Sequence, residues 1–305
     1  MPGAGLGVRM GELTEWLPKP LLPVWRRPLT AFAFDHLLEQ GVEAFVVNTH
    51  HCASAYERAF PDHSYRGRPV RFLYEPELLN TGGGLANAAG FLGDSTFFIH
   101  NGDILCSTPL DLLRDTHLRG GFEATLLLRS TGPSLQVAWD PRSGLVRSIR
   151  GRGSSGGAGP FQFTGIYVAE PAFLERLGPP RPFSVIAAFL EMIREGAGLG
   201  ACVDDEGIWA DLGDSDSYRR IQVGPLAPVY PNALVLPRIH PEAEISPQAE
   251  VDDRSIIGSG ARVARGAVVR ESVLWPGAEA GPAERVEQRV VRGAPERHRF
   301  FDLEP

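Results

Sequence analysis

Lysine is almost missing from this chain. Of its 30 basic residues, 29 are arginine and one, Lys19, is lysine. A Walker A loop needs a lysine that follows a glycine, and Lys19 follows Pro18, so a P-loop is excluded. A Ser-x-x-Lys hydrolase is excluded in the same way, because Trp16 stands where the serine would be. The bias toward arginine is typical of a GC-rich genome, and it leaves open why this one position is lysine.

Cysteine pairs, long apolar runs and excess positive charge are also lacking. Cys52, Cys106 and Cys202 form no CxxC pair and are typical of reduced thiols in a cytoplasmic protein. No apolar run reaches the roughly 20 residues that span a bilayer, and the start lacks the layout of a signal peptide. With a net charge of −7, the chain is poorly suited to nucleic acid or anionic membranes. We therefore expect a cytoplasmic protein with no nucleic-acid or membrane partner.

Residues 1–222 alternate between apolar strand-like runs and helical patterns. Strands are expected at 44–48, 70–74, 96–100 and 124–128, and helices at 29–40, 52–60, 85–91 and 110–118. This alternation predicts an α/β domain with a Rossmann-like, mostly parallel sheet. Shorter runs at 136–139, 145–149 and 161–168 predict an antiparallel addition, and two further helices are expected at 172–177 and 183–194.

A period of six residues begins after a proline-rich linker at 223–237. Its apolar positions are Ile239, Ile245, Val251, Ile257, Val263, Val269 and Trp275. Such hexads predict a short left-handed parallel β-helix over 238–292, in which three hexads complete a coil. Because Glu279 breaks the accompanying pattern of small residues, we expect the regular repeat to end near Trp275, after about two coils. The β-helix is expected to mediate homo-oligomer contacts, and 293–305 to form a charged tail.

The first candidate for chemistry is a glycine-rich loop, where Gly3, Ala4, Gly5 and Gly7 precede Arg9. Closely spaced glycines let backbone N–H groups approach phosphate oxygens, and arginine adds a planar fork of donors. Prolines on both sides of Lys19 stiffen the backbone around a cation that suits a phosphoryl group. On these residues alone, a flexible start and an ordinary surface lysine remain the alternatives.

Further motifs follow in order along the chain: Pro-Lys-Pro at 18–20, Asn-Thr-His at 48–50, Asn-Thr-Gly-Gly-Gly at 80–84, Asn-Gly-Asp at 101–103, Phe-Thr-Gly-Ile-Tyr at 163–167 and Trp-Ala-Asp-Leu-Gly-Asp at 209–214. With these motifs, the chain resembles the sugar-1-phosphate nucleotidylyltransferases (NDP-sugar pyrophosphorylases). The resemblance covers essentially the whole chain. It implies the nucleotide-diphospho-sugar transferase fold and a reaction of an NTP with a sugar 1-phosphate that gives an NDP-sugar and pyrophosphate.

The same resemblance implies a role for each matching residue. Arg9 and Lys19 would be catalytic residues that bind the triphosphate and the incoming sugar phosphate. Asp103 and Asp211 would hold Mg²⁺, and Thr164 and Gly165 would contact the sugar. The nucleotide would be bound by Gly3, Ala4, Gly5, Gly7, Gly82, Gly83 and Gly84.

Three acidic residues in or near these motifs have two possible roles each. Asn-Gly is a strong hairpin signal, so Asp103 is also compatible with a simple turn, although its place after a strand favours a ligand site. Asp214 is equally suited to capping the next helix. Glu75 is suited either to reading the base or to capping a loop.

The chain departs from the family pattern mainly at its start. Only Met1 and Pro2 precede Gly3, whereas a central strand needs about five or six residues. We therefore expect one of two explanations. Either the recorded start lies inside the true reading frame, or the sheet lacks its first strand. Val8 replaces a usual threonine, Glu12 replaces a usual proline, and a second lysine before the sugar-binding strand is missing.

The substrate and the activity are both left with alternatives. Members resembling the muramic-acid-1-phosphate uridylyltransferases also lack the second lysine, which favours UTP. The β-helix is typical of mannose-1-phosphate guanylyltransferase-like members, which favours GTP. The alternative to an active transferase is a catalytically weak homologue that binds or senses nucleotide-sugars.

Overall fold

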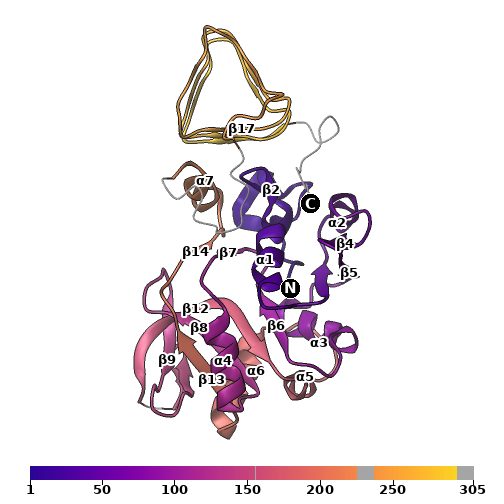
Figure 1. Ribbon diagram of the computed structural model, residues 1–305, viewed down its shortest axis with the longest axis vertical. Coiled ribbons are helices and arrows are strands. Elements are labelled where there is room, and N and C mark those ends of the chain that lie inside the picture. Colours follow the sequence, from indigo (N-terminus) through magenta and orange to yellow (C-terminus); the bar gives the residue numbers. More distant parts are fainter. Residues whose placement is uncertain (155, 225–236, 294–305) are drawn as a thin grey trace. The chain divides into compact units, whose positions relative to one another are not determined.

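The computed structural model describes residues 1–154, 156–224 and 237–293 (Figure 1). The chain divides into two compact units. Unit 1 comprises Met1–Leu6 and Ala33–Trp209, and unit 2 comprises Gly7–Phe32 and Ala210–Pro305. In the described ranges, every helix is too short or too polar to cross a membrane. Most of the expected linker at 223–237 and nearly all of the expected tail at 293–305 lie outside the described residues.

The helices are η1 (Val8–Thr14), η2 (Lys19–Leu21), α1 (Leu29–Leu38), α2 (Ser54–Ala59), α3 (Asn80–Leu92), α4 (Asp111–Gly120), α5 (Pro171–Leu177), α6 (Val185–Glu195) and α7 (Ser215–Val223). The strands up to residue 211 are β1 (Pro23–Val24), β2 (Arg27–Pro28), β3 (Phe45–Thr49), β4 (Ser64–Tyr65), β5 (Arg68–Tyr74), β6 (Phe97–His100), β7 (Ile104–Cys106), β8 (Ala124–Arg129), β9 (Leu135–Trp139), β10 (Val146–Ile149), β11 (Arg152–Gly153), β12 (Ala158–Ala169), β13 (Leu199–Val203) and β14 (Trp209–Asp211).

A seven-stranded sheet forms the larger part of unit 1. Its order is β11-β10-β9-β12-β8-β13, and β6 also pairs with β12. The long strand β12 runs antiparallel to β6, β8 and β9, whereas β13 is parallel to β8. Strands β6 and β8, and the antiparallel addition of β9, β10 and β12, lie where the sequence predicted them. The expected mostly parallel order is wrong for this sheet, because among its described pairings only β8 with β13 is parallel and the long strand β12 pairs antiparallel with three neighbours.

Strand β8 is buried along its whole length, because both faces of the sheet are covered there. Leu126 and Leu128 belong to the core cluster built with α3, α5 and α6. On the opposite face, the Oγ1 atom of Thr125 lies 2.8 Å from Nδ1 of His117 in α4. A strand covered on both faces cannot alternate between polar and apolar residues.

A second sheet of unit 1 contains β3, β5 and β4. Strands β3 and β5 are parallel and pair from Phe45 with Val70 through Thr49 with Tyr74. The Phe45 ring stacks on Phe34 of α1 with centroids 4.2 Å apart. Helix α1 therefore covers the face of this sheet to which Phe45 belongs.

The two residues before the glycine loop lie beside this second sheet. Pro2 forms a parallel bridge with Asn48, and the amino group of Met1 donates to the Val46 carbonyl at 2.6 Å. The Gly102 N–H, just after β6, donates to the Pro2 carbonyl at 3.0 Å. Met1 and Pro2 thus link β3 to the loop after β6 without forming a strand. They adjoin a narrow cleft lined by residues of β3, α3 and β6.

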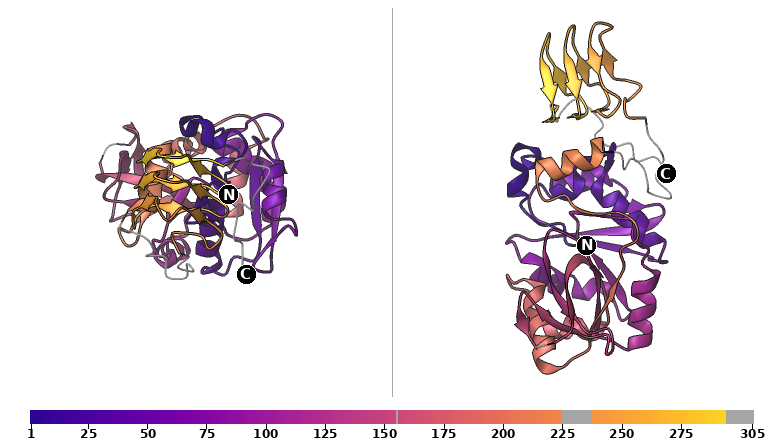
Figure 2. Two further views of the ribbon diagram at one scale, coloured as in Figure 1. Left: turned by 90° about the horizontal axis from the view of Figure 1, so that it is seen from above. Right: turned by 90° about the vertical axis from the view of Figure 1, so that its left-hand side faces the viewer.

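In unit 2, nine short strands form a three-sided parallel β-helix, seen along its axis in Figure 1 and from the side in Figure 2. They are β15 (Glu244–Ile245), β16 (Glu250–Val251), β17 (Ile256–Ile257), β18 (Arg262–Val263), β19 (Val268–Arg270), β20 (Val273–Leu274), β21 (Glu279–Ala280), β22 (Arg285–Glu287) and β23 (Val290–Val291). The three sheets are β15-β18-β21, β16-β19-β22 and β17-β20-β23, all parallel. Three strands in each sheet correspond to three coils.

The prediction that the repeat ends near Trp275 is wrong. Leu274 pairs with Val291, and Ala280 pairs with Val263, so the coils continue past Trp275. One side of the coil is a residue shorter than six, because Leu274 rather than Trp275 takes the inward position next after Val269. A strict count of six therefore falls one residue out of register from this point onward.

Candidate active site

Unit 2 brings three of the predicted site residues together. Nζ of Lys19 lies 3.9 Å from Oδ1 of Asp211. A Cβ atom added to Gly213 would lie 2.7 Å from Nη2 of Arg9 and 3.0 Å from Oδ1 of Asp211. The glycine thus leaves room for the guanidinium and the carboxylate on one side of it. Two cations and one carboxylate form the kind of site that holds a phosphate and a metal ion.

Lys19 is held in a buried turn, and the alternative of an ordinary surface lysine is wrong. Only 8% of its surface is exposed. It opens the 3₁₀ turn η2 between Pro18 and Pro20, and its carbonyl accepts a hydrogen bond from the Leu22 N–H at 3.1 Å. A buried ammonium needs an anionic partner, which Asp211 supplies here and which a bound phosphate would also supply.

Asp214 has the capping role that the sequence left as an alternative. Its Oδ1 accepts from the Ser217 backbone N–H at 2.8 Å, and the two residues form a capping box at the start of α7. The hydrogen bond from the Ser217 backbone holds the pKa of Asp214 below its usual range, and the nearby Arg9 acts in the same direction. Asp211, by contrast, is 40% exposed in its side chain and faces Lys19.

The glycine-rich loop is anchored at its first residue. The Gly3 N–H donates to Oδ1 of Asn48 at 2.9 Å, and its carbonyl accepts from the Tyr56 hydroxyl at 3.0 Å. Gly5 is exposed, and a Cβ added there would meet nothing within 4 Å. In unit 2, Gly7 has a φ of 64°, which favours glycine. The backbone at Gly5 is therefore open to a ligand.

The glycine run at 82–84 lies inside helix α3, which starts at Asn80 rather than at the expected residue 85. An added Cβ would lie 2.5 Å from the Phe183 ring at Gly82, 2.0 Å from the Arg181 carbonyl oxygen at Gly83, and 2.4 Å from Nδ2 of Asn48 at Gly84. Close packing therefore requires these glycines, although glycine disfavours helix. Their predicted contact with nucleotide stays a prediction that only backbone atoms could fulfil.

Glu75, whose role the sequence left undecided, is hydrogen-bonded to Asn48 in the protein interior. Glu75 is fully buried; its Oε1 accepts from Nδ2 of Asn48 at 2.7 Å and its Oε2 from the Leu79 N–H at 3.1 Å. Because Asn48 also accepts from Gly3, one chain of hydrogen bonds joins the glycine loop to the start of α3. The Asn-Thr-His motif was the only sequence signal for Asn48.

The loop that carries Asp103 lies next to the predicted sugar-binding residues. The Asn101 N–H donates to the Gly165 carbonyl at 3.1 Å, and Gly165, at a φ of 80°, leaves space for the Asn101 amide. Asn101–Asp103 does turn the chain, because the Ile104 N–H donates to the Asn101 carbonyl at 3.3 Å, as the alternative for Asp103 held. Strand β6 pairs with β12 rather than with β7, so this turn does not close a hairpin. Thr164 is fully buried, and its hydroxyl donates to the Leu127 carbonyl at 2.8 Å, so this hydroxyl points into the sheet.

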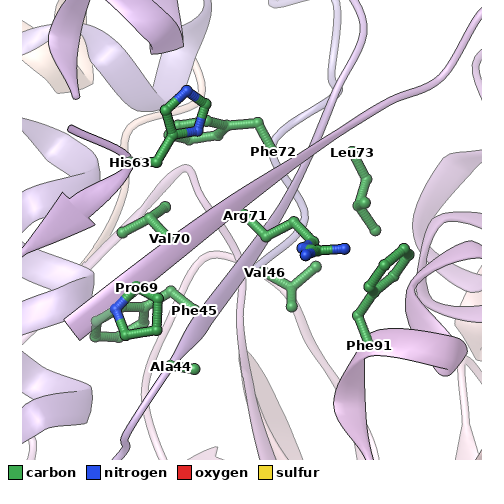
Figure 3. Close-up of a pocket in the computed structure, with 10 residues that line it drawn as sticks. All are labelled: Ala44, Phe45, Val46, His63, Pro69, Val70, Arg71, Phe72, Leu73 and Phe91. Atoms are coloured by element: carbon green, nitrogen blue, oxygen red, sulfur yellow. The ribbon is translucent and has the colours of Figure 1, made fainter. Parts of the chain in front are cut away.

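A hollow of about 640 Å³ lies elsewhere in unit 1 (Figure 3). Its lining includes Val46, Arg71, Leu73 and Phe91, with Arg71 stacked over the Phe91 ring at 4.5 Å. None of the lining residues is one of the predicted site residues.

The predicted metal ligands suit Mg²⁺ in their chemistry. Both are aspartates, whose hard carboxylate oxygens Mg²⁺ prefers, usually one or two with the remaining ligands from phosphates and water. In the described ranges, no three His, Cys, Asp or Glu side chains cluster as an all-protein metal cage would require. This donor set fits an ion that is held jointly with a substrate.

Two curated proteins resemble the chain over most of its length. The mannose-1-phosphate guanylyltransferase of Mycobacterium tuberculosis is 28% identical over 290 residues, which cover 94% of this chain and 77% of that protein. The N-acetylmuramate alpha-1-phosphate uridylyltransferase of Caulobacter vibrioides is 29% identical over 223 residues, which cover 69% of this chain and 89% of that protein.

Solved structures share the fold over almost three-quarters of the chain. HddC from Yersinia pseudotuberculosis, complexed with GMP-PN, has a TM-score of 0.58 at 22% identity, over 72% of this chain and 95% of that one. UDP-glucose pyrophosphorylase from Acinetobacter baumanii has a TM-score of 0.61 at 16% identity, over 74% and 93% of the respective chains. The family described as Nucleotidyl transferase matches residues 3–225, a range that contains every predicted site residue but not the hexad repeat. The chain therefore belongs to the nucleotidyl transferase family of enzymes.

Proposed function

We propose that this chain transfers a nucleotidyl group from UTP or GTP to a sugar 1-phosphate. An oxygen of the sugar phosphate attacks the α-phosphorus of the NTP, and the bond from that phosphorus to the bridging oxygen breaks. The products are an NDP-sugar and pyrophosphate. No general base is needed, because the attacking phosphate is already ionised.

The cluster of Lys19, Asp211 and Arg9 carries this proposal. A buried lysine that faces a half-exposed carboxylate, with a guanidinium close by, offers fixed charge to a phosphoryl group. The two curated relatives support the substrate class, because their names specify guanylyl or uridylyl transfer to a sugar phosphate. Both bases are therefore kept in the proposal.

The predicted site residues each have a positioning or electrostatic role in this mechanism. Lys19 and Arg9 neutralise charge on the phosphates as it shifts during in-line displacement, a reaction in which positioning supplies most of the catalysis. The open backbone at Gly5 offers N–H donors to phosphate oxygens. Asp103 and Asp211 would hold Mg²⁺, which neutralises triphosphate charge when bound. Gly165, beside the Asp103 loop, would adjoin the sugar.

Pyrophosphate release from a matrix of four NTPs and several sugar 1-phosphates, with Mg²⁺ present, tests the proposal. We expect turnover with UTP or GTP, and with mannose 1-phosphate or N-acetylmuramate 1-phosphate among the first sugars to examine. Nucleotide-sugar binding without turnover for any pair would contradict the transferase and select the alternative of a binding or sensing homologue.

We further propose that the β-helix joins copies of the chain and that the reaction takes place in the cytoplasm. Light scattering at several concentrations tests the first statement, and a monomer throughout would contradict it.

A further inference from the structure

The stretch between Arg9 and Lys19 begins as an interrupted 3₁₀ helix, in which the Thr14 hydroxyl bonds to the Gly7 and Gly11 carbonyls at 3.2 Å. Helix η1 has no side-chain cap and is interrupted at Gly11, which has φ of 56° and ψ of −132°. Glu12 and Glu15 are exposed, with side-chain exposures of 83% and 64%. An interrupted 3₁₀ helix of this length has little intrinsic stability, so contacts from elsewhere must fix its conformation.

Arg292, directly after the last strand of the β-helix, makes such contacts. Its Nη1 donates to the Glu12 carbonyl at 3.0 Å and to the Glu15 carboxylate. Its Nη2 lies 3.6 Å from the Glu12 carboxylate. One guanidinium thus binds a backbone carbonyl and two carboxylates, which requires the planar fork of arginine. Glu12 stands where the family usually has proline.

The β-helix also contacts the far side of the same stretch. The ring of Trp16 meets Trp275 edge to face, with centroids 5.9 Å apart. Nε1 of the buried Trp275 donates to the Tyr218 hydroxyl at 2.9 Å, and that hydroxyl donates to the Pro23 carbonyl. The β-helix therefore contacts residues 12, 15 and 16 directly, before Lys19 in the chain, and Pro23, after Lys19, through Tyr218 of α7.

On these contacts, which deepen the proposed function and rest on it, we propose that Arg292 is a positioning residue. It acts through Glu12 and Glu15 to fix the Val8–Glu15 segment, and with it the two cations that bind the triphosphate. The β-helix accordingly has a role in catalysis in addition to any role in assembly. Arg292 touches no substrate in this proposal.

The test compares Arg292→Ala with a matched control, Arg285→Ala. Arg285 lies on β22 of the same β-helix, and its ion pair is with Glu287 of its own strand. We expect Arg292→Ala to raise hydrogen exchange of the Val8–Glu15 amides and the KM for NTP by about fivefold, since a charge-assisted hydrogen bond and two exposed ion pairs are lost. The kcat at saturating NTP should change less, and the control should change neither quantity.

Two further variants separate positioning from general folding. The pair Glu12→Gln and Glu15→Gln removes the same charges from the loop side and leaves the β-helix intact, so it should reproduce the effect even if Arg292→Ala unfolds the coils. The exchanged pair Arg292→Glu with Glu15→Arg should recover part of the KM. Unchanged exchange and KM in the Glu12 and Glu15 variant would overturn the proposal. If the unmodified protein turns over no substrate pair, the proposed function fails, and the exchange measurement still decides whether Arg292 fixes the segment.

Discussion

The side-chain amide of Asn48 donates to the carboxylate of Glu75 across 2.7 Å, and both residues are buried. Asn48 is the fourth of the five residues of β3, and Glu75 comes directly after β5. The hydrogen bond therefore ties the ends of two parallel strands together, beside the point where the glycine loop begins.

Changing Glu75→Gln should destabilise unit 1. One oxygen of Glu75 accepts from Asn48 and the other from the Leu79 N–H, so an amide at this position must turn an NH₂ group toward another donor. A buried unsatisfied pair costs about 2 kcal/mol, or roughly 4–8 °C in Tm. The double variant Asn48→Asp with Glu75→Gln restores a donor opposite an acceptor and should recover much of the loss. A double variant no more stable than the sum of the two single changes would contradict this account.

Gly83→Ala and Gly90→Ala in helix α3 should have opposite effects. The methyl group at position 83 would lie 2.0 Å from the Arg181 carbonyl oxygen, whereas at position 90 it would meet nothing within 4 Å. We expect Gly83→Ala to cost about 3 kcal/mol or more through overpacking, and Gly90→Ala to add about 0.5–1 kcal/mol through helix propensity. Thermal melts of both variants check the prediction, and equal Tm values would refute it.

Lys19→Arg should lower kcat by about 10²-fold or more and leave the fold intact. A guanidinium is larger and planar, so it cannot take the place of a compact ammonium in a buried turn that faces Asp211. The measurement is pyrophosphate release at saturating substrates, with circular dichroism as the control for folding. Turnover within a few fold of the unmodified protein would be incompatible with the role assigned to Lys19.

Extending the chain ahead of Met1 by five β-branched residues should raise Tm by a few degrees. The cleft beside Met1 is lined by apolar residues of β3, α3 and β6, which an added parallel strand would cover. An extension of five Gly and Ser residues is the matched control, and it should add little. Equal Tm values for the two extensions would show that the cleft accepts no strand.

The same extension should be most stabilising at low pH. Burial lowers the pKa of the Met1 amino group to about 5, from an ordinary value of 8.0. Between these values the unfolded chain binds a proton that the folded chain does not, so the stability of the unextended protein rises with pH from about 5 to about 8. A peptide bond in place of the amine removes this dependence. Melts at pH 6 and pH 8.5 should therefore show the larger gain at pH 6.

Periodicity predicted the regular elements well where packing and local preference agree. The apolar run at 124–128 is β8 because both of its faces are buried, and the runs at 44–48 and 96–100 are β3 and β6. The start of α3 was missed because three successive glycines disfavour helix, and only distant groups such as the Phe183 ring explain them. The third coil of the β-helix was missed because on one side of the coil Leu274 follows Val269 at an interval of five residues, and a strict period of six does not allow for it.

The candidate site also contains residues that the sequence predicted and contacts that it did not. Motif order indicated Arg9, Lys19 and Asp211, and the structure brings these three together. Asn48, the side-chain partner of Glu75, lies 27 positions away, and the partners of Arg292 lie 277–280 positions away, so no local pattern could pair them. Thr164 belongs to a family motif, yet its hydroxyl is taken by the Leu127 carbonyl, a contact that depends on the strand register.

The solitary lysine has a practical chemical consequence. The chain offers a single ε-amine to an acylating reagent, and this amine lies beside Asp211 in the candidate active site. Intact-mass spectrometry would then separate a chain labelled at Lys19 from an unlabelled one, once the α-amine adduct is assigned by peptide mapping. Protection of that one adduct by a nucleotide would report occupancy before any sugar substrate is known.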